Sequence, residues 1–264
     1  MKIIYLHQYF NTIEMPGSTR SYELSKRLVA DGNEVKMITS KRDNYQSEKK
    51  NWTNENGIDV FWIPTSYSNK MSFFRRIISF LFFSYKSLKV ILKIDADVIY
   101  ASSTPLTIAV PAILYSKLKS KPMIFEVRDL WPEIPIAFGA LKSPFAKFIA
   151  QSLEKLAYNN SEHIVVLSKG MKDAIVKKGF PSNKIDVITN LANISDFSKT
   201  KKSSKVNDLL SSYEILPNDK LVIYTGALGH VNDVKFLINI AGEKIREDVL
   251  SVEPSSTIII SFAW

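Results

Sequence analysis

Short apolar segments alternate with longer helical segments along most of this sequence, and that alternation limits the possible folds more than any other feature. The expected strands are 2–6, 35–39, 60–63, 97–101, 123–127, 163–167 and 185–188. The expected helices are 19–31, 71–94, 105–119, 143–158 and 170–178. Strands that alternate with helices form a parallel sheet covered on both sides. The sequence therefore predicts a doubly wound α/β fold.

The alternation is interrupted once, by the basic, serine-rich segment 198–205, which is typical of a linker. After it a strand (221–225), a glycine-containing turn, a helix (231–245) and a strand (257–261) predict one further βαβ unit. About 50 residues bury too little surface to be stable alone. We therefore expect a complete N-terminal domain (1–197), a linker (198–215) and an incomplete second domain (216–264).

The composition excludes several classes of site. The chain has no cysteine, which excludes disulfides, thiol nucleophiles and thiolate metal sites. No apolar run reaches the ~18 residues of a membrane-spanning helix. The N-terminus has only four apolar residues after Met1-Lys2, too few for a secretory signal. We expect a cytoplasmic protein that is soluble or peripheral to the inner face of the membrane.

The net charge of +9 has a local source in segment 66–94. This segment carries six Lys and Arg residues and no acid, with phenylalanines between them. A basic, aromatic-rich helix suits an anionic membrane surface. A helix packed on the sheet with a basic outer face is the alternative. Nucleic acid is not expected as a partner, because no motif that reads bases accompanies the charge.

Polar loops follow the strands, and in doubly wound sheets ligands bind beyond the carboxyl ends of the strands. The candidate loops are 7–20, 125–133, 166–170, 188–197 and 224–230. The first ends in Gly17, Ser18, Thr19 and Arg20, where a helix begins. Free backbone N–H groups at a helix N-terminus suit a phosphate, and Arg20 adds positive charge. Taken alone, one glycine before a helix is more often a simple turn.

The second loop, FEVRDLWPE (125–133), places Arg128, Asp129 and Glu133 beyond a strand end. A structural alternative is an Arg128–Asp129 ion pair that pins the loop. Asn190 ends the last strand of the first domain, and Gly226 and Gly229 precede the helix of the second. There is no G-x-G-x-x-G or Walker loop. The D-x-D at 95–97 lies at a strand start, the wrong end for a site, so no metal is expected.

Taken together, these segments resemble the GT-B glycosyltransferases of retaining family 4, most closely the bacterial surface-polysaccharide branch of fucosaminyltransferases. The resemblance is carried by HQYF (7–10), GSTR (17–20), ELSKRLVADGNEV (23–35), DVIYASSTPLTIAVPAILYSKL (97–118), FEVRDLWPE (125–133), HIVVLSKGM (163–171) and YTGALG (224–229). It implies transfer of a sugar from a nucleotide-diphosphate donor to a lipid-linked glycan in O-antigen or capsule synthesis. The nucleotide sugar is a co-substrate, and no further cofactor is expected.

The resemblance also assigns roles. The N-terminal domain would handle the acceptor and the C-terminal domain the donor, with Arg128, Asp129 and Glu133 as catalytic candidates. The donor would contact Gly17, Ser18, Thr19, Arg20, Asn190, Gly226 and Gly229. Many members have His where this chain has Arg128, so a histidine role does not transfer to that position. Arg128 instead suits stabilisation of leaving-group charge.

Two further departures concern the second domain. Ala227 and Asn232 replace the basic pair that often holds the diphosphate in this family. The family's Glu-x7-Glu segment would lie beyond residue 264. We therefore expect a C-terminally truncated glycosyltransferase. The alternative is a non-catalytic remnant that binds the acceptor or the membrane.

Overall fold

The computed structural model describes residues 1–15, 17–41, 51–65, 71–139, 141–190, 194, 208, 211, 220–225, 233–236, 238–239, 250–253 and 257–262. The chain divides into two compact units, Met1–Leu191 and Ala192–Trp264. The domain boundaries predicted at 197 and 215 lie outside the described residues.

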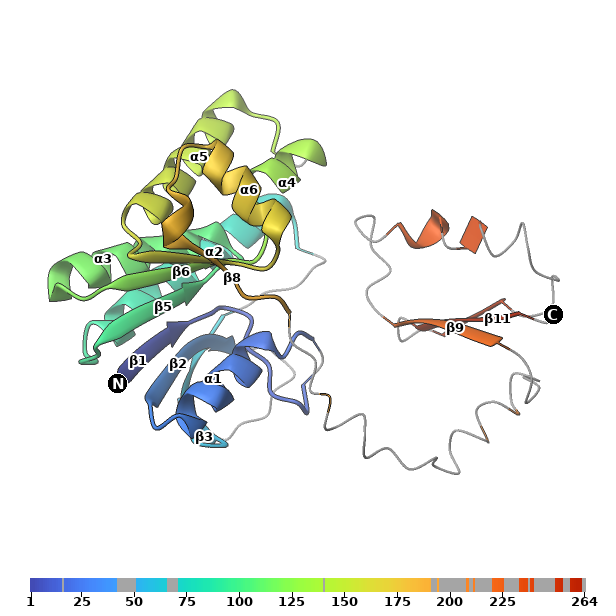
Figure 1. Cartoon of the computed structure of the whole chain (residues 1–264), viewed down its shortest axis with the longest axis horizontal. Coiled ribbons are helices and arrows are strands. Elements are labelled where there is room, and N and C mark those ends of the chain that lie inside the picture. Colours follow the sequence, from blue (N-terminus) through green and yellow to red (C-terminus); the bar gives the residue numbers. More distant parts are fainter. Residues whose placement is uncertain are drawn as a thin grey trace. The chain divides into compact units, whose positions relative to one another are not determined.

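The first unit is built on an eight-stranded sheet in the order β3-β4-β2-β1-β5-β6-β7-β8 (Figure 1). Its strands are β1 (Lys2–Leu6), β2 (Glu34–Lys41), β3 (Trp52–Glu55), β4 (Ile58–Pro64), β5 (Val98–Ser102), β6 (Met123–Val127), β7 (His163–Val166) and β8 (Ile185–Val187). All neighbours pair in parallel except β3 and β4. The predicted α/β fold with a mainly parallel sheet is confirmed.

Helices connect these strands, and the sequence pattern predicted all of them except the five-residue helix at 133–137. They are α1 (Arg20–Ala30), α2 (Phe73–Ile91), α3 (Ala109–Lys119), α4 (Glu133–Ala137), α5 (Pro144–Asn159) and α6 (Lys169–Lys177), with short 3-10 turns at Leu106–Ile108 and Ser182–Lys184. Helix α5 begins where expected, because Pro144 suits the first turn and the Ser143 hydroxyl accepts from the Ala146 N–H at 3.4 Å.

Helices cover both faces of the sheet, but unequally. Helix α1 packs on one face, where Tyr22 joins Tyr5, Phe10 and Trp62 in a buried cluster. Helices α2, α3, α5 and α6 contribute to the larger cluster on the other face (Figure 1). Strand β1 supplies alternate residues to both clusters, which explains why it is apolar from Ile3 to Leu6.

The hairpin of β3 and β4 was not among the predicted elements. Asn56 and Gly57 join the two strands, with φ values of 55° and 86°. These left-handed conformations are those of a tight hairpin turn, and Asn-Gly is its strongest sequence signal. Strand β3, Trp-Thr-Asn-Glu, has few apolar residues. The Asn-Gly turn was therefore the sequence feature from which this hairpin could have been predicted.

The second unit corrects the predicted parallel βαβ unit. Its strands β9 (Lys220–Thr225), β10 (Leu250–Glu253) and β11 (Thr257–Phe262) form a sheet in the order β10-β11-β9. Strand β11 is antiparallel to both neighbours. Only three residues separate β10 from β11, which permits a hairpin but no parallel crossover. Within 231–245, the described residues 234–236 and 238–239 are helical.

Candidate active site

The carboxyl ends of β1, β5 and β6 lie side by side, and the residues that follow them meet there. The chain runs from β1 to β2 on one side and returns through α2 to β5 on the other, so the strand order reverses between β1 and β5. Such a reversal is where doubly wound sheets bind their ligands. His7, Ser103 and Arg128 follow the three strands at this point.

Arg128 connects the loops of this edge. Its guanidinium donates to the Ser18 Oγ at 2.9 Å and lies 3.0 Å from the His7 Nε2. Its backbone N–H donates to the Ser103 Oγ at 3.1 Å. Two predicted candidates, Arg128 and Ser18, are thus brought into contact. The ion pair of Arg128 with Asp129, considered as a structural alternative, is not among the ion pairs of the described residues.

His7 is almost fully buried and contacts the Arg128 guanidinium through its Nε2. An arginine can only donate, so the Nε2 of His7 must be the acceptor. The proton of the neutral ring then lies on Nδ1, which is 2.9 Å from the Ser21 Oγ in α1. The chain Ser21–His7–Arg128 therefore fixes both the ring tautomer and the direction of the guanidinium.

Asp129 and Glu133 have different surroundings, although both were predicted as catalytic. The Asp129 Oδ2 accepts from the Thr104 hydroxyl at 2.9 Å, at an exposed position beside Arg128. Glu133 opens α4 and pairs with Lys178, which also bonds the Glu154 carboxylate at 2.5 Å. The structure thus groups Asp129 with the Arg128 loops and ties Glu133 to the end of α6.

The Glu133–Lys178–Glu154 contacts have electrostatic consequences inside this unit. Burial raises the pKa of the Glu154 carboxyl, and the Lys178 ammonium acts in the opposite direction. Burial disfavours the charge of Lys178, but its bonds to both carboxylates outweigh that effect and raise its pKa. Lys178 therefore keeps its charge, and the contact serves to hold α4 against α5 and α6.

Arg20 is buried rather than directed toward a ligand. Its Nε donates to the Glu126 carboxylate at 2.9 Å, and both side chains are almost inaccessible to solvent. Its two terminal nitrogens donate to the backbone carbonyls of Thr189 at 2.5 Å and Ile188 at 2.7 Å. The guanidinium predicted to meet a phosphate is therefore occupied internally, and Arg128 is the one that reaches the Gly17–Ser18 loop.

Glu126 is the residue of this region that sequence reasoning missed. It lies within β6, fully buried, and accepts from Tyr100 at 3.0 Å and from Ser102 as well as Arg20. Burial, with the Glu126 charge beside it, raises the pKa values of Tyr100 and Tyr5. The available signal was an acid in an otherwise apolar strand, which requires a buried counter-charge.

Gly17 shapes the loop that Arg128 contacts. Its φ of 131° lies in the region that favours glycine, and an added Cβ would lie 2.7 Å from the Asn11 Nδ2. The Asn11 amide is buried and donates to the Tyr9 and Ser18 carbonyls at 3.2 and 3.1 Å. Glycine at this position therefore allows Asn11 to hold both ends of the loop.

We expect the Gly17→Ala substitution to lower the free energy of unfolding by about 1–3 kcal/mol from backbone strain, with a further loss because Asn11 must move. Thermal denaturation monitored by circular dichroism measures this effect. Gly32→Ala is the matched control, since Gly32 has a φ of 81° but nothing within 4 Å of an added Cβ. Equal destabilisation by the two changes would contradict a steric role for Asn11.

The remaining predicted residues are distributed as follows. Thr19 precedes α1 without a side-chain capping bond. Asn190 is exposed just after the carbonyls that Arg20 binds. Gly226 and Gly229 lie outside the described residues. Ser168, from the third loop, caps α6 by accepting from the Met171 N–H at 3.2 Å, which is a structural role.

Among the residues that the structure describes, no group of three or more His, Asp or Glu side chains could hold a metal ion. A cavity of about 660 Å³ does exist in the first unit, between the β3–β4 hairpin and α2. It is lined by none of the residues that contact Arg128.

Residues 17–196, about two thirds of the chain and including the Arg128 loop, match Glycosyltransferase Family 4. The chain belongs to this family. It is also 22% identical over 243 residues to a protein of Escherichia coli (strain K12) named as a colanic acid biosynthesis glycosyl transferase, WcaI. That match covers 86% of this chain and 59% of WcaI.

Solved structures support the fold of this family 4 chain. Anabaena Alr3699/HepE, in complex with UDP-glucose, superposes with a TM-score of 0.58 at 16% identity, covering 95% of this chain and 59% of HepE. Sucrose-phosphate synthase of Thermosynechococcus elongatus superposes with a TM-score of 0.56 at 12% identity, covering 80% of this chain and 52% of that enzyme. UDP-GlcNAc 2-epimerase of Methanocaldococcus jannaschii superposes with a TM-score of 0.52 at 15% identity, covering 97% of this chain and 67% of the epimerase. The fold alone does not separate transferases from epimerases.

Proposed function

We propose that this protein transfers a sugar from a nucleotide-diphosphate donor to a lipid-linked glycan, with retention of configuration, during assembly of an O-antigen or capsule polysaccharide. The family match over 17–196 supports glycosyl transfer, and the name of the WcaI relative supports polysaccharide synthesis. The UDP-glucose named in the HepE complex supports a nucleotide sugar as the donor. Membership of the fucosaminyltransferase-like branch is part of the same proposal. The chain spans 59% of the length of both relatives, so the whole activity is part of this proposal.

The single observation that carries the proposal is Arg128 held over the Gly17–Ser18 loop. Negative charge develops on the diphosphate as the sugar leaves, and a fixed guanidinium in a partly buried site stabilises that charge. His7 and Ser18 hold two branches of the guanidinium in place, so little reorganisation is needed during the reaction. Helix α1 begins two residues after Ser18, and the positive end of its dipole therefore lies next to the same loop.

The proton chemistry of the proposed reaction needs few protein groups. The donor phosphate accepts the proton of the acceptor hydroxyl, so no carboxylate pair is required. Asp129, exposed and oriented by Thr104, would position that hydroxyl. Glu133 would act indirectly, since its bond to Lys178 fixes the helix that follows the loop. We propose that the nucleotide sugar is the only co-substrate and that no metal takes part.

Sugar transfer to lipid extracts tests this proposal. The chain is incubated with radiolabelled UDP-, GDP- and dTDP-sugars and lipid-linked glycans, and labelled glycolipid is counted. We expect transfer from one donor class, and its loss in the Asp129→Asn variant. If the chain neither binds nor transfers any of the sugars, the proposal is wrong and the non-catalytic alternative holds. Unaltered transfer by the variant would contradict the placement of the site.

We also propose that the reaction takes place at the inner face of the cytoplasmic membrane, where a lipid-linked acceptor would be reached. Within the part of the chain that the structure describes, no helix is long and apolar enough to cross a membrane. The support comes from segment 66–94, whose described residues contain the whole of α2 and include exposed Lys and aromatic side chains.

A further inference from the structure

The outer surface of α2 carries a continuous apolar stripe. Phe74, Ile78, Leu81 and Tyr85 recur at the spacing of one helix face, and each is more than half exposed. Buried residues such as Phe83 and Ile91 lie on the opposite face, toward the sheet. A helix that is apolar on both faces and exposed on one has a large unpartnered surface.

The stripe on α2 is one part of a larger surface. Helix α3 contacts both α2 and α5, and the three helices cover the same face of the sheet (Figure 1). On α5, Phe145 is 72% and Phe148 is 66% exposed. On α3 the exposed apolar residues are Val110, Leu114 and Leu118. We call the outer surface of α2, α3 and α5 the helical face. Three adjacent helices thus expose apolar side chains in the same direction.

All exposed charged residues of the helical face are positive. Its exposed charged residues are Arg75, Lys86, Lys89, Lys117, Lys119 and Lys155. The three helices contain a single acid, Glu154, which is buried and bonded to Lys178. Apolar side chains surrounded by cations are the features by which proteins bind the surface of an anionic bilayer.

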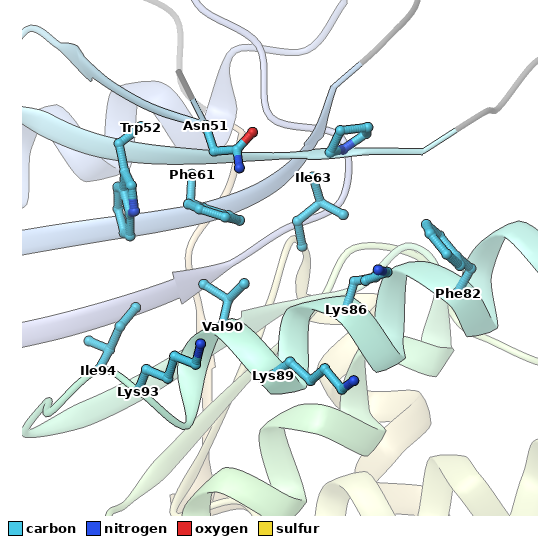
Figure 2. Close-up of a pocket in the computed structure, with 11 residues that line it drawn as sticks. Asn51, Trp52, Phe61, Ile63, Phe82, Lys86, Lys89, Val90, Lys93 and Ile94 are labelled. Carbon is cyan, nitrogen blue, oxygen red and sulfur yellow. The ribbon is translucent and has the colours of Figure 1, made fainter. Parts of the chain in front are cut away.

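A groove along the edge of the helical face extends this pattern. Figure 2 shows Lys86 and Lys89 on α2, and Lys93 just after its end, below Trp52 and Phe61 of the hairpin. These side chains line the cavity of about 660 Å³ described above, together with apolar residues such as Val90. Lysines beside an aromatic and aliphatic wall suit a phosphate attached to a hydrocarbon chain.

We propose that the helical face docks on an anionic bilayer, with lipid phosphates received by the lysines of the groove. The inference deepens the proposed function, because it names the surface that would bring the chain to a lipid-linked acceptor. A second copy of the chain is the weaker alternative. A symmetric dimer through this face would place its cations opposite one another, and like charges oppose such contact.

Sedimentation with phospholipid vesicles tests the docking surface without any need for activity. Vesicles of phosphatidylcholine alone are compared with vesicles containing phosphatidylglycerol, and the partition coefficient is measured at low and high salt. We expect strong binding only to the anionic vesicles, weakened by salt because exposed charges are screened. Failure of sugar transfer would leave this result unaffected, so the two proposals can fail separately.

Three variants test separately how the groove lysines and the apolar residues of α5 contribute to vesicle binding. The triple change Lys86→Gln, Lys89→Gln, Lys93→Gln should weaken partitioning about 100-fold. Its control, Lys2→Gln, Lys26→Gln, Lys36→Gln, removes the same charge from other parts of the unit and should change it far less. Phe145→Ser with Phe148→Ser, on the helix farthest from the groove, should weaken binding at least about tenfold. All three sets change surface side chains, so the fold should be retained.

Several outcomes would overturn the proposal. Equal binding to neutral and anionic vesicles would exclude the role of the lysines. Equal losses of vesicle binding in the two triple lysine variants would show that binding depends on net charge alone and not on the lysines of the groove. Unchanged binding of the α5 variant would contradict docking through the three helices together. A concentration-dependent dimer that the α5 variant abolishes, with no vesicle binding, would identify the face as an interface between copies.

Discussion

Arg20→Met is expected to lower the free energy of unfolding of the first unit by about 3–5 kcal/mol. The change leaves the Glu126 carboxylate charged inside the protein, where solvent does not reach it, and removes both donors to the Ile188 and Thr189 carbonyls. In a unit of this size such a loss lowers the melting temperature by roughly 10 °C. Chemical denaturation followed by tryptophan fluorescence provides the measurement.

The double variant Arg20→Met, Glu126→Gln separates the buried charge from the lost packing. The glutamine stays hydrogen-bonded to Tyr100 or Ser102 but carries no charge, so it should restore a large part of the stability. Arg27→Met is the control for arginine removal in the same helix. The Arg27 side chain is 49% exposed and pairs with one carboxylate, that of Glu23, so its loss should cost less than that of the buried Arg20. A double variant no more stable than Arg20→Met would show that the ion pair is not the cause.

Arg128→Ala is expected to reduce the rate of sugar transfer about 10²–10³-fold, the usual effect of losing one fixed donor to transition-state charge. Stability should change little, because the side chain is partly exposed and the backbone bond to Ser103 remains. Arg128→Lys keeps the charge but loses the fork that reaches both His7 and Ser18, so it should recover only part of the rate. The rate is measured at saturating donor, in the assay of labelled glycolipid.

The matched control for this prediction is Arg27→Ala, which removes an arginine from the surface of α1 and should leave the rate unchanged. If Arg128→Ala raised the Michaelis constant for the donor and left the turnover rate unaltered, Arg128 would contribute to ground-state binding and not to the transition state. Such a result would contradict the role proposed for it.

The sequence predicted the strands of the first unit well because burial on both faces leaves a clear pattern. The residues of β1 and β6 are apolar almost throughout, and their observed bounds equal the predicted ones. Strand β3 and helix α4 were not predicted. The first is short and polar, and the second has five residues that include a proline. The local sequence patterns of such short elements are too weak to recognise, and tertiary contacts determine the conformation of these segments.

The candidate site was predictable in position and less so in its contacts. Arg128 was selected because it follows a strand, and Ser18 because the loop after the first strand ends there at a helix start. The order of the strands brings the two loops together. Two arginines near the same edge carry equal charge in the sequence, yet Arg20 is buried and Arg128 is not. That difference depends on Glu126, which lies 106 positions from Arg20. No local feature of either segment contains this information.

Short strands lie at both edges of the main sheet, and this arrangement bears on how the protein behaves at high concentration. Strand β3 has four residues and β8 has three, with Asn54 and Asp186 among them. Brief, polar edges offer little backbone for another chain to extend the sheet. Aggregates of this unit should therefore form through helix surfaces and dissolve in mild detergent, without acquiring the cross-β order of fibrils.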